Sequence, residues 1–167
     1  MGIRLADPLG VTGRVTIVLR DARTGQVIRT VRAHNITCVA GRSVLAALLN
    51  GETSYGGAAI PTGSSWLSAC YGAVGTGTGT PAASDTAMFS ELARTAVAFS
   101  SRSTTQTTLD WFFPTSMANG TVTETGLFLL ATGTAGSGYM LSHATVPALT
   151  KANTETMTLQ IQITFNS

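Results

Sequence analysis

The chain has 167 residues, the length of one domain, and its apolar content of 44% is enough for a core without metal ions or disulfides. Only 11% of the residues are charged, against about 25% in an ordinary soluble domain, so fewer ions must be desolvated when the surface meets a neighbour. No apolar run reaches the length of a membrane span, and residues 1–10 lack the apolar stretch of a secretion signal. Cys38 and Cys70 lack metal-ligand or redox spacing and are expected as free, buried thiols.

The N-terminal part of the sequence predicts an arm followed by a hairpin. Residues 1–12 have no hydrophobic period and predict an extended arm, whereas residues 13–167 predict one β domain. Val15, Ile17 and Leu19 alternate with Arg14, Thr16 and Val18, and this period of two predicts a strand. Residues 21–25 supply a turn with Gly25 in the left-handed position, and residues 26–34 return as the second strand.

Positive charge is concentrated in this N-terminal part. Residues 1–42 hold seven arginines and two aspartates, a net charge of +5, and the remainder has three bases and six acids, a net charge of −3. One interpretation is that the arginines are solvated residues that protect strand edges from pairing. The other is that they dock on an acidic surface of a partner. The candidate assembly contacts are Arg4, Arg14, Arg20, Arg23, Arg29 and Arg32.

The middle of the chain combines helical and loop signals. Four apolar residues recur at helical spacing in residues 41–50 and predict a short helix that ends at Asn50-Gly51. Residues 52–65 predict an exposed loop, and the apolar run 66–74 has the length of a strand. A glycine-rich loop follows, and Ser84 or Asp85 is expected to cap a second short helix that extends to Arg94.

The C-terminal half predicts strands almost throughout. Candidate strands cover residues 95–101, 105–113, 121–130 and 139–146, and turn-forming residues separate them. In the last segment, odd-numbered residues from Met157 to Phe165 are apolar and even-numbered ones are polar, which is typical of a half-buried antiparallel strand. In total, about eight strands and two short helices predict a mainly β fold, an antiparallel β-sandwich with a jelly roll as its leading form.

Catalytic and cofactor-binding motifs fail at particular positions. The glycine-rich loop has Thr80 where a dinucleotide fingerprint needs glycine, and the only lysine of the chain, Lys151, cannot complete a P-loop there. His34 and His143 fall on predicted strands and are expected as surface or satisfied core residues. We therefore expect no enzyme activity, no cofactor or metal, and no nucleic-acid or membrane partner.

Two carboxylates need separate consideration. Asp110 and Glu124 lie on neighbouring predicted strands, and Trp111 could stack on a sugar, so a polysaccharide-degrading enzyme remains a remote alternative. The aromatic content of 7% is low for a sugar cleft. Glu124 also lies in the middle of a strand, where a buried carboxylate needs a partner. We predict an ion pair with Arg94 that holds the second helix on the sheet; a solvated Glu124 is the alternative.

Three stretches together resemble a known class of proteins. They are HNIT, AGR and LAALL at residues 34–37, 40–42 and 45–49; YGAVGTG, PAASDTA and ELAR at 71–77, 81–87 and 91–94; and ETGLF at 124–128. In this order and at these distances they resemble small virion proteins of tailed bacteriophages, in tail-associated, fibre-associated and head-decorating components. The resemblance covers about residues 13–166 and brings no catalytic residues with it.

The resemblance implies a β-sandwich that self-associates, as a dimer or trimer, and attaches to a capsid or tail surface of a virion assembled in the host cytoplasm. The first role that it implies is a capsid decoration or cement subunit, whose N-terminal arm and basic hairpin bind the major capsid protein. The second is a tail, collar or baseplate component that adapts a fibre or binds a host receptor. The arm favours the first role.

Overall fold

The strands at the two ends of the described chain pair along their whole length. The computed structural model describes residues 10–63 and 65–166. Strand β1 (Gly10–Asp21) is antiparallel to β11 (Glu155–Asn166), from Gly10 opposite Asn166 to Asp21 opposite Glu155. Residues 10–12, which the sequence placed in the arm, therefore belong to the sheet, and the rest of the predicted arm lies outside the described residues.

These strands belong to a nine-stranded sheet in which all the pairings are antiparallel. The other strands are β2 (Val27–Thr37), β5 (Tyr71–Gly75), β6 (Glu91–Ala96), β7 (Phe99–Ser103), β8 (Gln106–Phe113), β9 (Gly120–Leu129) and β10 (Tyr139–Lys151). Their order across the sheet is β6-β5-β9-β10-β2-β1-β11-β8-β7. A separate two-stranded ladder joins β3 (Ser54–Tyr55) to β4 (Ala58–Ala59). The fold is therefore mainly β, as predicted.

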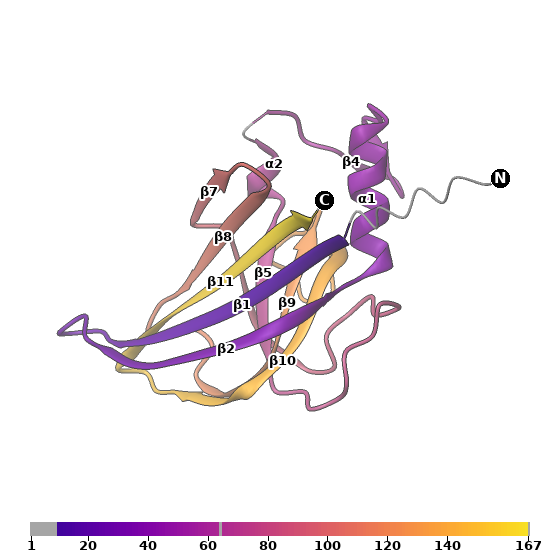
Figure 1. Ribbon diagram of the computed structural model, residues 1–167. Helices are drawn as coiled ribbons and strands as arrows, with labels where there is room; N and C mark the ends of the chain where they lie inside the picture. The colour runs from indigo at the N-terminus through magenta and orange to yellow at the C-terminus, as the bar shows by residue number, and fades with distance from the viewer. Residues whose placement is uncertain (1–9, 64, 167) are drawn as a thin grey trace.

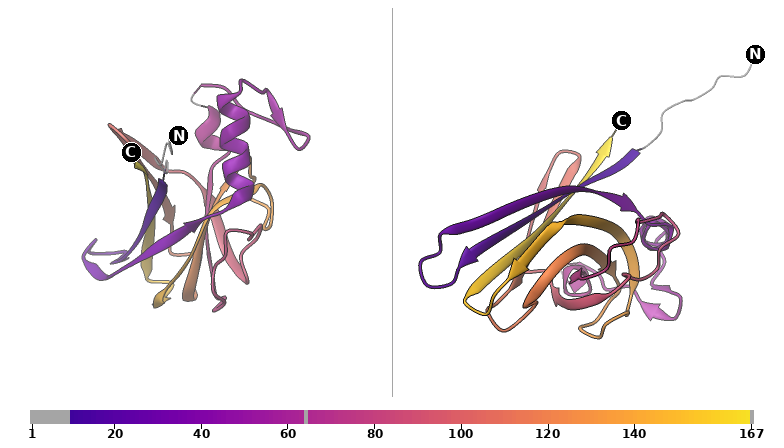
Figure 2. Two further views of the ribbon diagram at one scale, coloured as in Figure 1. Left: turned by 45° about the vertical axis from the view of Figure 1, so that its right-hand side comes forward. Right: turned by 90° about the horizontal axis from the view of Figure 1, so that it is seen from below.

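The large sheet curls, and the change of direction occurs at β2 (Figures 1 and 2). This strand pairs with β1 over most of its length but with β10 only through Ile36 and Thr37. Across the core, Trp111 of β8 lies so close to Gly72 of β5 that a Cβ at position 72 would collide with the indole. The two outer parts of the sheet thus enclose a common core.

The core follows the period of two seen in the sequence. Val15, Ile17 and Leu19 of β1 are buried, and so are Met157 and the next three odd-numbered residues of β11. Strands β8, β9 and β10 add buried aromatic and aliphatic side chains to the same cluster, among them Trp111, Phe113, Leu127, Leu129, Leu141 and Leu149. Full burial of each such side chain contributes roughly 1.5–3 kcal/mol.

One predicted helix is confirmed, and the other is wrong. Helix α1 (Val39–Leu49) covers the predicted segment 41–50 and packs on β10 through Gly41, against Leu141. The segment from Ser84 to Arg94 contains no helix, because β6 begins at Glu91 and the amides of the preceding residues are hydrogen-bonded to a side chain from another strand. The second helix is instead α2 (Ser65–Ser68). Of the strand predicted over residues 66–74, only residues 71–74 lie in a strand, β5.

Candidate functional site

The arginines that were predicted as assembly contacts lie on one hairpin, formed by β1 and β2. Arg4 lies outside the described residues, and the other five have exposed side chains. They are Arg14, Arg20, Arg23, Arg29 and Arg32. Among the described residues, none of the five forms an ion pair. Figure 1 shows the hairpin projecting beyond the strands beside it, so its end is available to a partner.

Hydrogen bonds around Asp21 fix the end of the hairpin. The carboxylate oxygen Oδ1 accepts from the amide of Thr24 at 2.7 Å, from its hydroxyl at 2.8 Å and from the amide of Arg23 at 3.1 Å. These bonds, those of Thr24 first, lower the pKa of Asp21 below its ordinary value. The Arg20 guanidinium donates to the carbonyl of Gly25, which has a φ of 71°. Positive φ costs glycine little, as the sequence predicted for this position.

The same end of the hairpin exposes branched apolar side chains. Val27 and Ile28 are each 51% exposed, and Val27 is paired with Arg20 across the two strands. An apolar patch beside guanidinium groups is the composition expected of a protein interface, since arginine and large apolar side chains both gain from burial against a partner. The end of the hairpin is therefore the first candidate interaction surface.

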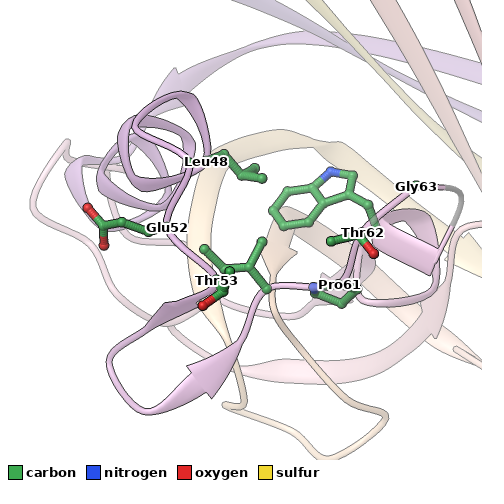
Figure 3. Close-up of a pocket in the computed structure, with 9 residues that line it drawn as sticks. Leu48, Glu52, Thr53, Pro61, Thr62 and Gly63 are labelled. Atoms are coloured by element: carbon green, nitrogen blue, oxygen red, sulfur yellow. The ribbon is translucent and has the colours of Figure 1, made fainter.

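A pocket of about 450 Å³ lies at the C-terminal end of α1 (Figure 3). Leu48, Ile60 and Trp66 provide its apolar lining, and the Glu52 carboxylate points away from it. The volume lies in the range of small-molecule sites. None of the site residues predicted from the sequence reaches this pocket.

The predicted ion pair between Arg94 and Glu124 is not formed, because each residue has another partner. Arg94 makes a two-pronged ion pair with Glu91, in which Nε–Oε1 and Nη2–Oε2 are both 2.6 Å. Its guanidinium also donates to the carbonyl of Ser137 at 2.9 Å and lies 4.4 Å from the centre of the Phe128 ring. The two pairing residues lie on one strand, β6, so this pair holds no helix on the sheet.

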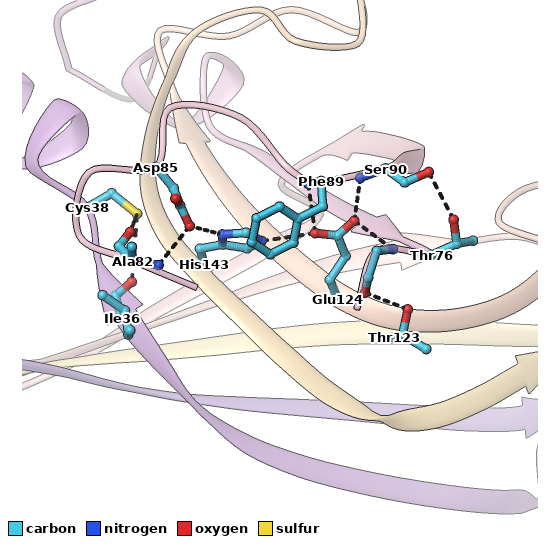
Figure 4. Close-up of polar contacts among 11 residues, drawn as sticks. Ile36, Cys38, Thr76, Ala82, Asp85, Phe89, Ser90, Thr123, Glu124 and His143 are labelled. Carbon is cyan, nitrogen blue, oxygen red and sulfur yellow. Dashed lines mark hydrogen bonds and ion pairs between the residues drawn. The ribbon is translucent and has the colours of Figure 1, made fainter. Parts of the chain in front are cut away.

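Glu124 belongs to a chain of carboxylate, imidazole and carboxylate that is buried at Glu124 and His143 and partly exposed at Asp85 (Figure 4). Its Oε2 lies 3.0 Å from Nε2 of His143, and Nδ1 of His143 lies 2.6 Å from Oδ2 of Asp85. The side chains of Glu124 and His143 have no exposed surface. Glu124 also accepts backbone hydrogen bonds from Gly77, Phe89 and Ser90, at 2.9, 3.0 and 2.7 Å. All of these donors lie in the loop between β5 and β6.

The electrostatics of this chain favour ionised carboxylates. Burial raises the pKa of Glu124, but the hydrogen bonds from His143 and from the three amides outweigh it, and the pKa lies below its ordinary value. Burial likewise raises the pKa of Asp85, and the amide of Ala82 together with His143 brings it below its ordinary value. An imidazole between two ionised carboxylates is held in a fixed orientation by both.

This arrangement suits a structural role rather than catalysis. Both ring nitrogens of His143 are engaged by carboxylates, so the imidazole has no free nitrogen with which to activate a hydroxyl or thiol. The carboxylates lie on opposite sides of the ring, and the described part of the chain contains no group of three side chains suited to hold a metal ion. The chain of hydrogen bonds instead fastens the loop of residues 76–90 to β9 and β10.

The cysteines add no nucleophile. Cys38 and Cys70 are both free and buried, as the sequence predicted. Burial raises the pKa of Cys38 to about 11 and that of Cys70 to about 12. Since the thiolate is the reactive form, neither thiol is activated at neutral pH.

Sequence reasoning missed the link between Glu124 and the glycine-rich loop. A Cβ at Gly75 or Gly77 would collide with the Glu124 carboxylate. The absence of side chains at these glycines therefore lets the loop backbone approach the buried carboxylate of Glu124. The signal available in the sequence was the conjunction of a carboxylate in the middle of an apolar strand and glycines without a phosphate-binding motif.

The structure does not bring Asp110 and Glu124 together as a pair of carboxylates that could cleave a sugar. Asp110 lies on β8 and Glu124 on β9, and four other strands separate these two in the sheet. Glu124 is buried, and Trp111 has no exposed surface on which a sugar could stack. The two carboxylates therefore do not flank a common substrate.

Comparison with known proteins gives no relative: no protein-family model, curated protein sequence or solved structure matches this chain. Within the described residues, neither helix has the length and apolar content needed to cross a membrane.

Proposed function

We propose that this protein is a structural subunit of a tailed-phage virion, and that it decorates the capsid by docking its β1–β2 hairpin and N-terminal arm on the shell. The observation that carries the proposal is the projecting hairpin, with five exposed arginines and the exposed side chains of Val27 and Ile28. The resemblance of residues 13–166 to small virion proteins indicates the kind of assembly.

Charge and composition support docking on an acidic surface of the major capsid protein. The arginines of the hairpin form no ion pair among the described residues. Carboxylates of the capsid protein could therefore bind them without breaking an existing ion pair. Complementary charge speeds association and fixes the orientation of the complex. The low charge of the remaining surface suits self-association as a dimer or trimer on the particle. We further propose that the curled sheet corresponds to the β-sandwich of small virion proteins, since β5 and β8 face each other across the core as two layers.

The second candidate is a tail, collar or baseplate component that adapts a fibre or binds a host receptor. The pocket beside α1 favours it, because Leu48, Ile60 and Trp66 offer a receptor group an apolar surface. A polysaccharide-degrading tail enzyme is the remote alternative, and turnover of host glycan by the purified chain would reveal it.

Binding to particles that lack the protein tests the proposal. The triple variant Arg20→Glu, Arg23→Glu and Arg29→Glu is compared with Arg102→Glu, which reverses an exposed charge on β7. We expect saturable binding of many copies to the capsid by the wild type and by the control, and none by the triple variant. A second variant that lacks residues 2–9 tests the arm and leaves β1 complete.

The location of the bound protein separates the two candidates. Antibody labelling of particles in the electron microscope should mark the head. Labelling of the tail would contradict capsid decoration and support the second candidate function, a tail, collar or baseplate component. Capsid binding that is undiminished in the triple variant would exclude the hairpin as the contact.

A further inference from the structure

The register of four strands lines up polar side chains on the outer face of the sheet. Because Val15, Ile17 and Leu19 face the core, the even-numbered residues of β1 face outward. Arg14 is opposite His34 of β2 on one side and Gln162 of β11 on the other. On β11, Thr164 is in turn opposite Gln106 of β8. These residues come from β2, β1, β11 and β8, a width of roughly 14 Å at the usual strand spacing.

A groove of about 520 Å³ follows this row, lined by Arg14, His34, Gln106, Gln162 and Thr164 among others. A hollow of about 290 Å³ adjoins it, where Arg32 joins Arg14 and His34. The two hollows share Arg14 and His34 and therefore adjoin each other. Since Thr16 is opposite Arg32, the two arginines are diagonal neighbours across β1 and β2, at about 7–8 Å. Their guanidinium groups can reach one ligand.

The groove is electropositive at one end and neutral at the other. None of its lining residues is acidic, and of the acids on these four strands Asp110 comes closest in register, opposite Gln160. Neither Arg14 nor Arg32 forms an ion pair within the described part of the chain. At the other end, Nε2 of Gln106 donates to the hydroxyl of Thr164 at 3.1 Å, which orders this wall of the groove.

We propose that this groove binds an anionic carbohydrate, with its carboxylate or phosphate group on Arg14 and Arg32 and its hydroxyl groups along Gln106, Gln162 and Thr164. Guanidinium groups bind both kinds of anion through paired hydrogen bonds. Glutamine amides and threonine hydroxyls each donate and accept, as recognition of sugar hydroxyls requires. The inference rests on the register and on the lining of the groove, and it holds whether the protein occupies the head or the tail of a particle.

Other polyanions fit the groove less well. An acidic peptide binds best where it adds to a sheet edge or fills apolar pockets, whereas this groove crosses the interior of the sheet and has no large apolar side chain in its lining. A single-stranded nucleic acid stacks its bases on aromatic side chains, and no phenylalanine, tyrosine or tryptophan lines the groove.

Calorimetric titration of the full chain tests the proposal. The probes are oligogalacturonate, a phosphorylated mannan oligosaccharide and neutral dextran oligosaccharide, and the variants are Arg14→Gln and Arg32→Gln. The matched control is Arg23→Gln, which removes an exposed arginine at the end of the hairpin. We expect binding of one or both anionic sugars and none of dextran, with a loss of about ten- to a hundredfold in each groove variant and none in the control. Which anionic sugar binds identifies carboxylate or phosphate as the group recognised.

Three results would overturn the proposal. They are equal binding of dextran, equally tight binding of poly-glutamate or single-stranded DNA, and an equal loss in Arg23→Gln. Thermal unfolding of each variant confirms that the fold is retained, as expected for exposed positions.

Discussion

His143 and Glu124 face each other across the β9–β10 ladder with 3.0 Å between Nε2 and Oε2, and neither side chain has exposed surface. Their strands are paired, with His143 opposite Gly126 and Glu124 opposite Thr145. Around this contact, the Glu124 carboxylate accepts from three loop amides, and the imidazole reaches Asp85. One buried anion thereby orders a loop that has no regular secondary structure of its own.

Glu124→Gln should destabilise the protein strongly. The amide keeps one oxygen but turns an NH₂ group toward a backbone N–H or the imidazole, so a buried donor is left without an acceptor. Loss of one partner from a buried charged network costs about 3–5 kcal/mol. We expect a loss of about 3 kcal/mol in the free energy of unfolding, measured by urea denaturation at neutral pH.

The control for this variant is Glu52→Gln, at an exposed carboxylate that accepts a hydrogen bond from the Asn50 side chain in the loop after α1. Its effect should stay within about 0.5 kcal/mol. Equal stabilities of the two variants would show that the buried network contributes nothing.

Stability should fall in acid because of the same network. The pKa values of Asp85 and Glu124 are lower in the folded protein than their ordinary values of 3.8 and 4.5. The unfolded chain therefore binds more protons as the pH falls. The contribution of these two carboxylates to stability is present above their ordinary pKa values, declines as the pH falls below them, and is lost as the pH passes the lower folded values. Each group adds a slope of up to about 1.4 kcal/mol per pH unit.

Urea denaturation between about pH 3 and 6 measures this slope. Asp85→Asn removes one of the two carboxylates and should flatten the curve in that range. An unchanged slope in Asp85→Asn would mean that this carboxylate has the same pKa in the folded and unfolded protein.

The regular part of the fold could be predicted from the sequence, since it depends on local patterns. Alternation around Val15 and Ile161 predicted β1 and β11 because one face of each strand is buried. The turn at Gly25 and helix α1 were likewise signalled by residues next to one another in the chain. The pairing of β1 with β11 could not be predicted in this way, because it joins two segments at opposite ends of the chain that no local pattern relates.

The candidate site depended on contacts between distant residues, and here prediction failed. Glu124 was recognised as a carboxylate in need of a partner, but Arg94 was chosen because a helix was expected to carry it. The actual partners are His143, on the next strand, and amides of the loop between β5 and β6, which lie more than thirty residues away in the sequence. Asp85 was interpreted as a helix cap, whereas its carboxylate accepts from the amide of Ala82 and contacts the imidazole.

Gly77→Ala should destabilise the loop. A Cβ at this buried position would collide with the Glu124 carboxylate and the Cβ of Phe89, so the amide of residue 77 would have to withdraw from the carboxylate. We expect a loss of about 2–3 kcal/mol, measured by thermal and urea denaturation. Gly133→Ala is the matched control, since no atom lies within 4 Å of the added Cβ. A similar stability of the two variants would contradict the close contact at Gly77.

Arg94→Lys should lose stability although the charge is retained. The guanidinium makes two hydrogen bonds of 2.6 Å to Glu91, donates to the Ser137 carbonyl and lies over the Phe128 ring. An ammonium group is a single point and cannot match both carboxylate oxygens while it keeps the other contacts. We expect a loss of about 2 kcal/mol by urea denaturation. Arg102→Lys, at an exposed arginine of β7, should change stability by less than about 0.5 kcal/mol.

A double-mutant cycle with Glu91→Gln isolates the pair from the other contacts of Arg94. If the paired geometry stabilises the fold, the two single losses should add to more than the loss in the double variant, because either substitution already removes the two-pronged contact. The energy that remains for Arg94→Lys in the Glu91→Gln background then belongs to Ser137 and Phe128. Strict additivity would show that Arg94 acts through those two residues alone, with no contribution from the ion pair.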